Sequence, residues 1–185
     1  MLEKRKPLFA QSGGGITASG GEALLQAKFL EEFLYLCRQK AVHTCIETAM
    51  NVSKENIDRV IDNVDLWIAD YKCDDTALHK EYCGFGNELI KENLRYIAQR
   101  HKNIWIRTPI IPGITDSKDM MLKAKAFAAS LGSNIKKHEF IEFNPMFRNK
   151  YVSLGMTKVV PFVILIVIIG RCRVARFCTL CTHLF

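Results

Sequence analysis

The sequence predicts an α/β fold in which about five parallel strands form a partial or full barrel. Short segments rich in β-branched residues alternate with amphipathic segments of helical period, and only a few residues connect them. Parallel strands of this kind collect their functional side chains at one end, where the carboxyl ends of the strands meet. Polar residues follow the predicted strands at this end, and they are Glu22, Glu47, Asp70, Lys72, Arg107 and Asn144.

A glycine-rich stretch from Gly13 to Glu22 opens the first predicted unit. Its two glycine clusters flank a short run of β character, residues 16–19. Glycine has no Cβ, so we expect positive φ at Gly20 and Gly21 and a close approach of their backbone to a ligand. Glu22 then supplies a carboxylate that can accept a hydrogen bond from a bound ammonium. The stretch is therefore interpreted as a binding loop.

The next elements follow from apolar period and capping residues. Apolar side chains at three- and four-residue steps predict one amphipathic helix over residues 24–40, and residues 42–48 predict a buried strand that ends in Glu47 and Thr48. Ser53 is placed to cap a short helix that reaches Ile61. A third strand over residues 64–71 leads into Asp70 and Lys72.

The second half of the chain repeats this alternation. Asp74 or Asp75 can cap a short helix, and Asn87 can cap a longer one that continues to Ile97. Residues 103–108 predict a fourth strand that contains Arg107. Ser117 opens a helix through residue 131, and residues 140–144 predict a fifth strand.

Charge and composition restrict the class of protein. The 185 residues suit one domain, and 49% of them are hydrophobic. The net charge of +7 is concentrated after Glu142, where six basic residues and no acidic residue occur. Because no basic patch with interleaved aromatics lies in the predicted globular part, we expect no nucleic-acid partner. Met1 to Pro7 contain no apolar leader, so we expect a cytoplasmic protein.

Several motifs resemble the glycyl-radical enzyme activating enzymes, the pyruvate formate-lyase-activating group of the radical S-adenosylmethionine superfamily. The resemblance runs from about Gly13 to about Tyr151. It rests on residues 14–22, Glu47-Thr48, Asp70-Tyr71-Lys72, residues 87–94, and Trp105-Ile106-Arg107 followed by residues 111–116.

The resemblance implies a ligand, a cofactor and a partner. Ser19, Gly20, Gly21 and Glu22 match the family loop that holds the amino group of S-adenosylmethionine. The positions of Glu47, Thr48, Asp70 and Lys72 match those that line the methionyl carboxylate, the ribose and, in some members, a monovalent cation, and Arg107 matches an arginine that contacts the same molecule. Family members use a 4Fe-4S cluster to generate a 5′-deoxyadenosyl radical, which acts on a glycine of a partner glycyl-radical enzyme.

The sequence departs from the family in its cysteines. The family holds its cluster with three cysteines spaced C-x₃-C-x₂-C, ahead of the glycine loop, and no cysteines here have that spacing. We therefore expect no catalytic or metal-binding residues, no cluster in this chain, and a partial TIM-like barrel of the radical S-adenosylmethionine type whose first β/α unit is missing. In addition, Ala23 replaces a usual proline and Asn144 a frequent histidine.

The carboxyl-terminal part differs in composition. We divide the chain into a partial radical S-adenosylmethionine core, residues 1–156, and a hydrophobic, basic, cysteine-containing tail, residues 157–185, which is interpreted as a frameshifted or misjoined end. The apolar run 159–169 is too short to span a membrane, and Cys178 and Cys181 form only one pair of a zinc-type motif. The alternative to an activating enzyme is a non-catalytic barrel remnant that binds a partner, or a non-functional product.

Overall fold

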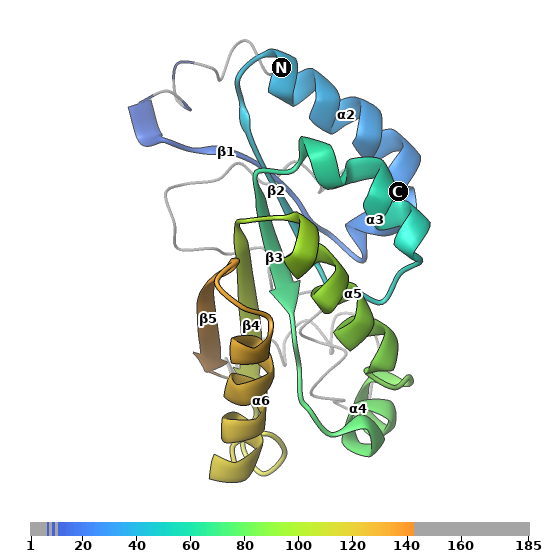
Figure 1. Cartoon of the computed structure of the whole chain (residues 1–185), viewed down its shortest axis with the longest axis vertical. Helices are drawn as coiled ribbons and strands as arrows, with labels where there is room; N and C mark the ends of the chain where they lie inside the picture. Colours follow the sequence, from blue (N-terminus) through green and yellow to red (C-terminus); the bar gives the residue numbers. More distant parts are fainter. Residues whose placement is uncertain (1–6, 8, 10, 143–185) are drawn as a thin grey trace, which may run out of the picture.

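Five parallel strands form one sheet in the computed structural model, which describes residues 7, 9 and 11–142 (Figure 1). The strands follow chain order across the sheet, β1-β2-β3-β4-β5. Their bounds are Gly15–Ala18 for β1, His43–Thr48 for β2, Leu66–Asp70 for β3, Ile104–Ile110 for β4 and Ile135–Glu142 for β5. The predicted α/β class with five parallel strands is confirmed.

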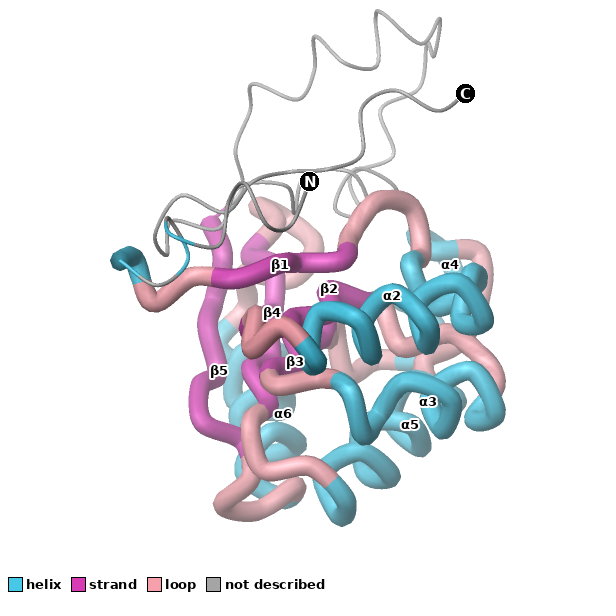
Figure 2. Tube along the Cα trace, turned by 90° about the horizontal axis from the view of Figure 1, so that it is seen from above, coloured by secondary structure: helices cyan, strands magenta, loops and turns pink. Residues whose placement is uncertain are grey.

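The helices lie along one side of this sheet and leave its other face uncovered by helices in the described part of the chain (Figures 1 and 2). Helical segments connect each strand to the next, as parallel pairing requires. Their bounds are Ala23–Gln26 for the 3-10 helix η1, Ala27–Gln39 for α2, Lys54–Val60 for α3, Ile61–Asn63 for the 3-10 helix η2, Thr76–Cys83 for α4, Glu88–Arg100 for α5 and Lys118–Ser130 for α6.

Two of the predicted caps form hydrogen bonds. The Asp75 carboxylate accepts from the Leu78 amide at 2.8 Å, and the Ser117 hydroxyl accepts from the Met120 amide at 3.3 Å. Asn87 also occupies the N-cap position of its helix, but its side chain makes no cap bond. The predicted position of Asn87 is therefore right, but its side-chain amide bonds to a neighbouring loop instead of to the first turn of the helix. Ser53 likewise occupies the N-cap position of α3 without a side-chain cap bond.

Several predicted boundaries differ from the structure, and two of the differences have a clear cause. The predicted helix over residues 24–40 is divided into η1 and α2, because the first turn is wound as a 3-10 helix against Glu22. The fifth strand begins at Ile135 rather than at Phe140. Its first residues are largely charged and partly exposed, so pairing with β4 rather than apolar character makes them a strand. Asn144 and the tail lie outside the described residues.

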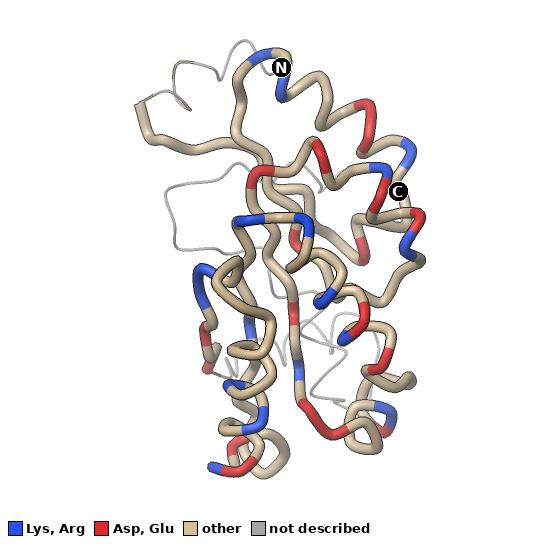
Figure 3. The backbone as a smooth tube through the Cα atoms, viewed as in Figure 1, with Lys and Arg blue, Asp and Glu red and all other residues tan. Residues whose placement is uncertain are grey.

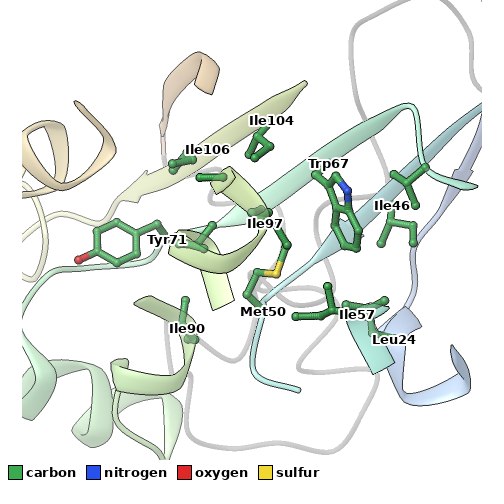
Figure 4. Close-up of a cluster of buried hydrophobic side chains, with 14 of the residues drawn as sticks. Leu24, Ile46, Met50, Ile57, Trp67, Tyr71, Ile90, Ile97, Ile104 and Ile106 are labelled. Carbon is green, nitrogen blue, oxygen red and sulfur yellow. The ribbon is translucent and has the colours of Figure 1, made fainter. Parts of the chain in front are cut away.

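The core fills the space between the sheet and its helices. Trp67 of β3 is completely buried and lies among side chains from neighbouring elements, including Ile46, Met50 and Ile57 (Figure 4). From α5, Ile90, Leu94 and Ile97 are buried in the same cluster, whose main members are aliphatic. None of the helices in the described ranges is long and apolar enough to cross a membrane.

The strand register aligns the carboxyl ends of the central strands. Thr48 of β2 is paired with Ala69 of β3, and Asp70 of β3 is paired with Arg107 of β4. Parallel pairing in this register places the last residues of β2 and β3 close to Arg107, which lies three residues before the end of β4. The fold therefore brings the polar residues predicted from sequence to one edge of the sheet.

Candidate functional site

Four buried charged side chains lie together, and they come from Glu47 in β2, Asp70 at the end of β3, Lys72 just beyond it and Arg107 in β4. In Figure 3 the tube of β3 is acidic at its carboxyl end and basic just beyond it. Burial is nearly complete, with exposed fractions of 6% for Glu47, 2% for Asp70, 4% for Lys72 and 5% for Arg107. Charged side chains are almost never buried to this degree unless they are paired or meet a ligand.

Glu47 and Arg107 form the first ion pair of this site. Arg107 Nη1 donates to Glu47 Oε1, and the Ser19 hydroxyl donates to Glu47 Oε2 at 2.9 Å. Burial raises the pKa of Glu47 to about 7, against the opposing effect of the Arg107 guanidinium. Ser19, predicted as part of the binding loop, is thus joined to β2 through the Glu47 carboxylate.

Asp70 and Lys72 form a looser second pair. Lys72 Nζ lies 3.7 Å from Asp70 Oδ2, while Asp70 Oδ1 is buried and has no hydrogen-bond partner within the described residues. Burial raises the pKa of Asp70 to about 6, although the Lys72 ammonium favours the ionised form. One carboxylate oxygen at the centre of the site is therefore available to a donor.

Arg107 also retains an unused donor. Its Nε is buried without a hydrogen-bond partner in the described part of the chain, and Glu139 Oε2 of β5 lies 3.7 Å away. Lys137 Nζ shares the Glu139 carboxylate at 3.0 Å. The site thus contains an unsatisfied acceptor on Asp70 and an unsatisfied donor on Arg107.

The Glu22 carboxylate, which we expect to accept from a bound ammonium, already accepts three hydrogen bonds within the protein. Its Oε1 accepts from the Leu24 amide at 3.1 Å and caps η1, while its Oε2 accepts from the Thr48 hydroxyl at 3.0 Å and from the Ala49 amide at 2.9 Å. The carboxylate therefore joins the glycine loop to the end of β2. A carboxylate has about four acceptor positions, so capacity for one more donor remains.

The glycine loop only partly follows the predicted backbone. Gly20 has φ of 131°, a conformation that residues with a Cβ rarely adopt, whereas Gly21 is not among the residues with positive φ. Of the two glycines that can take positive φ, Gly20 does so and Gly21 does not. A Cβ at either position would meet no atom within 4 Å, so both glycines border open space.

Sequence reasoning missed several residues beside the site. Glu139 and His138 come from β5, where the Thr108 hydroxyl and His138 Nε2 are 3.0 Å apart. Asn87 and Asn93 are fully or almost fully buried and bond to the loops that follow β3 and β2. The pattern of apolar residues does not reveal that an asparagine is buried. The motif over residues 87–94, which includes both asparagines, is the one signal in the sequence that points to them.

No cluster-binding set of side chains is present among the described residues. Cys37, Cys45 and Cys73 are buried, Cys83 is half-buried, and no group of three histidine, cysteine or acidic side chains there is placed to hold a metal ion. Burial raises the pKa of Cys73 to about 12 and that of Cys83 to about 11, so these thiols remain protonated.

Comparison with known proteins gives a consistent set of relatives. The (2S)-3-sulfopropanediol dehydratase activating enzyme of Klebsiella oxytoca is 33% identical over 156 residues, which cover 84% of this chain and 49% of that protein. The pyruvate formate-lyase 1-activating enzyme of Escherichia coli K12 is 33% identical over 146 residues, which cover 78% of this chain and 59% of that protein. The chain thus spans about half to three fifths of the length of these curated relatives.

A solved structure shares the fold. A domain of the pyruvate-formate lyase-activating enzyme from Bacteroides vulgatus superposes with a TM-score of 0.65 at 28% identity, over 76% of this chain and 92% of that chain. No family model matches the sequence. By homology over most of its length and by its shared fold, the chain belongs to the glycyl-radical enzyme activating enzymes of the radical S-adenosylmethionine superfamily.

Proposed function

We propose that the carboxyl-terminal edge of the sheet binds S-adenosylmethionine. This molecule carries an ammonium, a carboxylate, a sulfonium and a ribose, so a site for it needs acceptors and donors close together. Asp70, Glu47 and the remaining acceptor capacity of Glu22 suit the cationic and hydroxyl groups, and Lys72 and Arg107 suit the carboxylate. The site also includes Ser19, Gly20, Gly21 and Thr48, and Asn144 belongs to it by resemblance only.

The observation that carries this proposal is the pair of unsatisfied atoms in the site. Asp70 Oδ1 and Arg107 Nε are buried without hydrogen-bond partners in the described residues, and they belong to residues that are 2% and 5% exposed. Leaving a buried charged group unsatisfied costs more than about 1–3 kcal/mol. A ligand that meets both atoms would recover this free energy, which explains why a folded protein would keep them.

The residues of this chain do not fit a 4Fe-4S cluster. Such a cluster needs closely spaced thiolates, and no C-x₃-C-x₂-C sequence occurs among the 185 residues. We infer that this chain binds S-adenosylmethionine without cleaving it. A reduced cluster beside the bound S-adenosylmethionine would be needed to supply radical chemistry. Here the protein groups only bind and orient the molecule.

The biological role follows from the relatives. Their names identify activating enzymes of a dehydratase and of pyruvate formate-lyase. We infer that this chain derives from a protein that acts on a glycyl-radical enzyme, and that it corresponds to the S-adenosylmethionine-binding part of such an enzyme. The second candidate is a non-catalytic binding protein, which the missing cysteine motif favours.

Calorimetric titration with S-adenosylmethionine tests the binding site. We expect saturable binding by the full chain, and at least about tenfold weaker binding by Asp70→Asn, which removes a charge-assisted contact. Asp58→Asn is the matched control, because Asp58 is an exposed aspartate that pairs with Arg100 away from the site. Absence of binding at millimolar ligand would refute the proposed site.

A second measurement tests the inference that the chain binds S-adenosylmethionine without cleaving it. After anaerobic reconstitution with iron and sulfide, we expect no 5′-deoxyadenosine from S-adenosylmethionine under reducing conditions. Formation of 5′-deoxyadenosine above a control without iron would contradict the inference that the chain binds without cleaving.

A further inference from the structure

Two buried asparagines, one at the N-cap of α5 and one within this helix, make the same unusual contact with two different loops. Asn93 Nδ2 donates to the carbonyl oxygens of Met50 and Val52, both at 2.8 Å. Asn87 Nδ2 donates to the carbonyl oxygens of Cys73 and Asp74, both at 3.0 Å. Each side chain thus uses both of its amide hydrogens on two carbonyl groups of one loop.

These loops directly follow the strands that carry the site. The β2 loop, residues 49–53, continues from Glu47 and Thr48, and the β3 loop, residues 71–75, contains Lys72. A loop in this position has no strand partner for its carbonyl groups, and buried carbonyl groups must be satisfied. The two asparagines supply those partners, so each loop is bonded to α5 immediately beyond the site residues.

Helix α5 is a firm reference for both loops. Ile90, Leu94 and Ile97 are almost completely buried between the helix and the sheet, which fixes the helix relative to the strands. Asn87 is fully buried at the start of this helix, and Asn93 is 2% exposed in its second turn. A displacement of either loop would therefore break its hydrogen bonds to the asparagine, because the packing of α5 against the sheet keeps the helix in place.

The β2 loop needs such support because its backbone is strained. Met50 has φ of 60°, which is uncommon for a residue with a side chain, and its amide donates to the Thr48 hydroxyl at 2.9 Å. Strained conformations persist only where surrounding contacts determine them. The same Thr48 hydroxyl donates to Glu22, so the strained turn, the glycine loop and the end of β2 form one connected set of bonds.

We propose that Asn87 and Asn93 are positioning residues, which hold the β3 and β2 loops so that the charged groups of the site keep their arrangement for the ligand. The proposal rests on the proposed function for the identity of the ligand, S-adenosylmethionine. The positioning itself is a property of the ligand-free protein. Asn87 acts on the loop that holds Lys72, and Asn93 acts on the loop that follows Glu47 and Thr48.

The test compares amide hydrogen exchange in the full chain without ligand. In Asn93→Ala we expect exchange at the Ala49 and Met50 amides to be about tenfold faster, because two hydrogen bonds to their loop are lost, while the β3 loop keeps its wild-type rates. In Asn87→Ala we expect the reverse, with faster exchange confined to residues 71–78. Ile97→Val is the control, since it loosens the core of the same helix without removing a loop bond.

Two further variants test the donors themselves. Aspartate has nearly the shape of asparagine but no amide hydrogens, so Asn93→Asp and Asn87→Asp should loosen the same loops as the alanine variants do. If Asn93→Ala does not fold, Asn93→Ser retains one donor and should show a smaller change in the same loop. Wild-type exchange in both aspartate variants would show that the side chains act through shape, and would overturn the proposal.

Affinity gives the functional readout. When fewer molecules have their loops in place, the apparent affinity for the ligand is lower. We therefore expect about tenfold weaker binding of S-adenosylmethionine by Asn93→Ala and unchanged binding by Ile97→Val. Equal loss of affinity in the two variants, or faster exchange spread evenly over the protein, would overturn the positioning role. If the wild-type chain binds no S-adenosylmethionine, the proposed function fails, while the exchange pattern still decides the positioning of the loops.

Discussion

Replacement of Asp70 by asparagine should stabilise the protein above neutral pH. Asp70 is 2% exposed, and burial raises its pKa from an ordinary 3.8 to about 6 even though Lys72 opposes this change. A change of this size corresponds to about 3 kcal/mol between the charged and neutral forms of the folded protein. Asparagine resembles the neutral carboxyl group in shape, so Asp70→Asn removes this cost.

The stability gain of Asp70→Asn should depend on pH. Because the folded protein holds the proton of Asp70 more strongly than the unfolded chain does, wild-type stability is complete near pH 4 and falls as the pH rises through about 6. The free energy of unfolding of Asp70→Asn should therefore equal that of the wild type near pH 4 and exceed it by about 3 kcal/mol above pH 7.

Urea unfolding followed by circular dichroism between pH 4 and pH 8 measures this difference. Asp58→Asn is the control, because Asp58 is exposed in its ion pair with Arg100 and should show no such gain with pH. If Asp70→Asn were less stable than the wild type at pH 8, the Asp70–Lys72 pair would be a net stabilising contact, and the reasoning from burial would be refuted. A gain in stability together with weaker S-adenosylmethionine binding is the outcome expected of a ligand site.

Three other substitutions test the remaining contacts. Arg107→Ala should destabilise the protein by about 3–5 kcal/mol in urea unfolding, because it leaves Glu47 buried without its partner. The added change Glu47→Gln should restore part of the lost stability, and no recovery in the double variant would contradict this explanation. Glu22→Ala should cost about 2 kcal/mol through the loss of three hydrogen bonds, and an effect equal to that of the exposed control Glu32→Ala would argue against it. Gly20→Ala should cost about 1–3 kcal/mol because of its positive φ, and Gly21→Ala much less; equal thermal stabilities would refute the difference.

The order of the strands could be predicted from sequence because each one is a short apolar segment between helical patterns. The predicted strands around residues 16, 45, 67 and 105 correspond to β1, β2, β3 and β4. The start of β5 could not be predicted in this way, since Lys136 and Lys137 are exposed and give no apolar signal. Such residues are common on edge strands, where charge prevents unwanted pairing.

The site could be predicted only as a set of residue types. The carboxyl ends of parallel strands collect polar side chains, so the closeness of Glu47, Asp70 and Arg107 follows from topology. Which partner each group takes does not follow from topology. Glu22 bonds to Thr48 and Ala49 rather than facing an open loop, and the Asn87 side chain bonds to a neighbouring loop rather than to the first turn of α5. These choices depend on distances between elements that are far apart in the sequence.

The sequential order of the strands has a consequence for how the chain folds. Every pair among the five described strands joins two consecutive strands, so none of these five must wait for a distant segment before it can pair. Loop closure is then limited to one helical connection at a time, and its entropic cost stays nearly constant from unit to unit. As the chain leaves the ribosome, each new strand can dock on the one made before it, and the site is completed only when β4 brings Arg107 to Glu47.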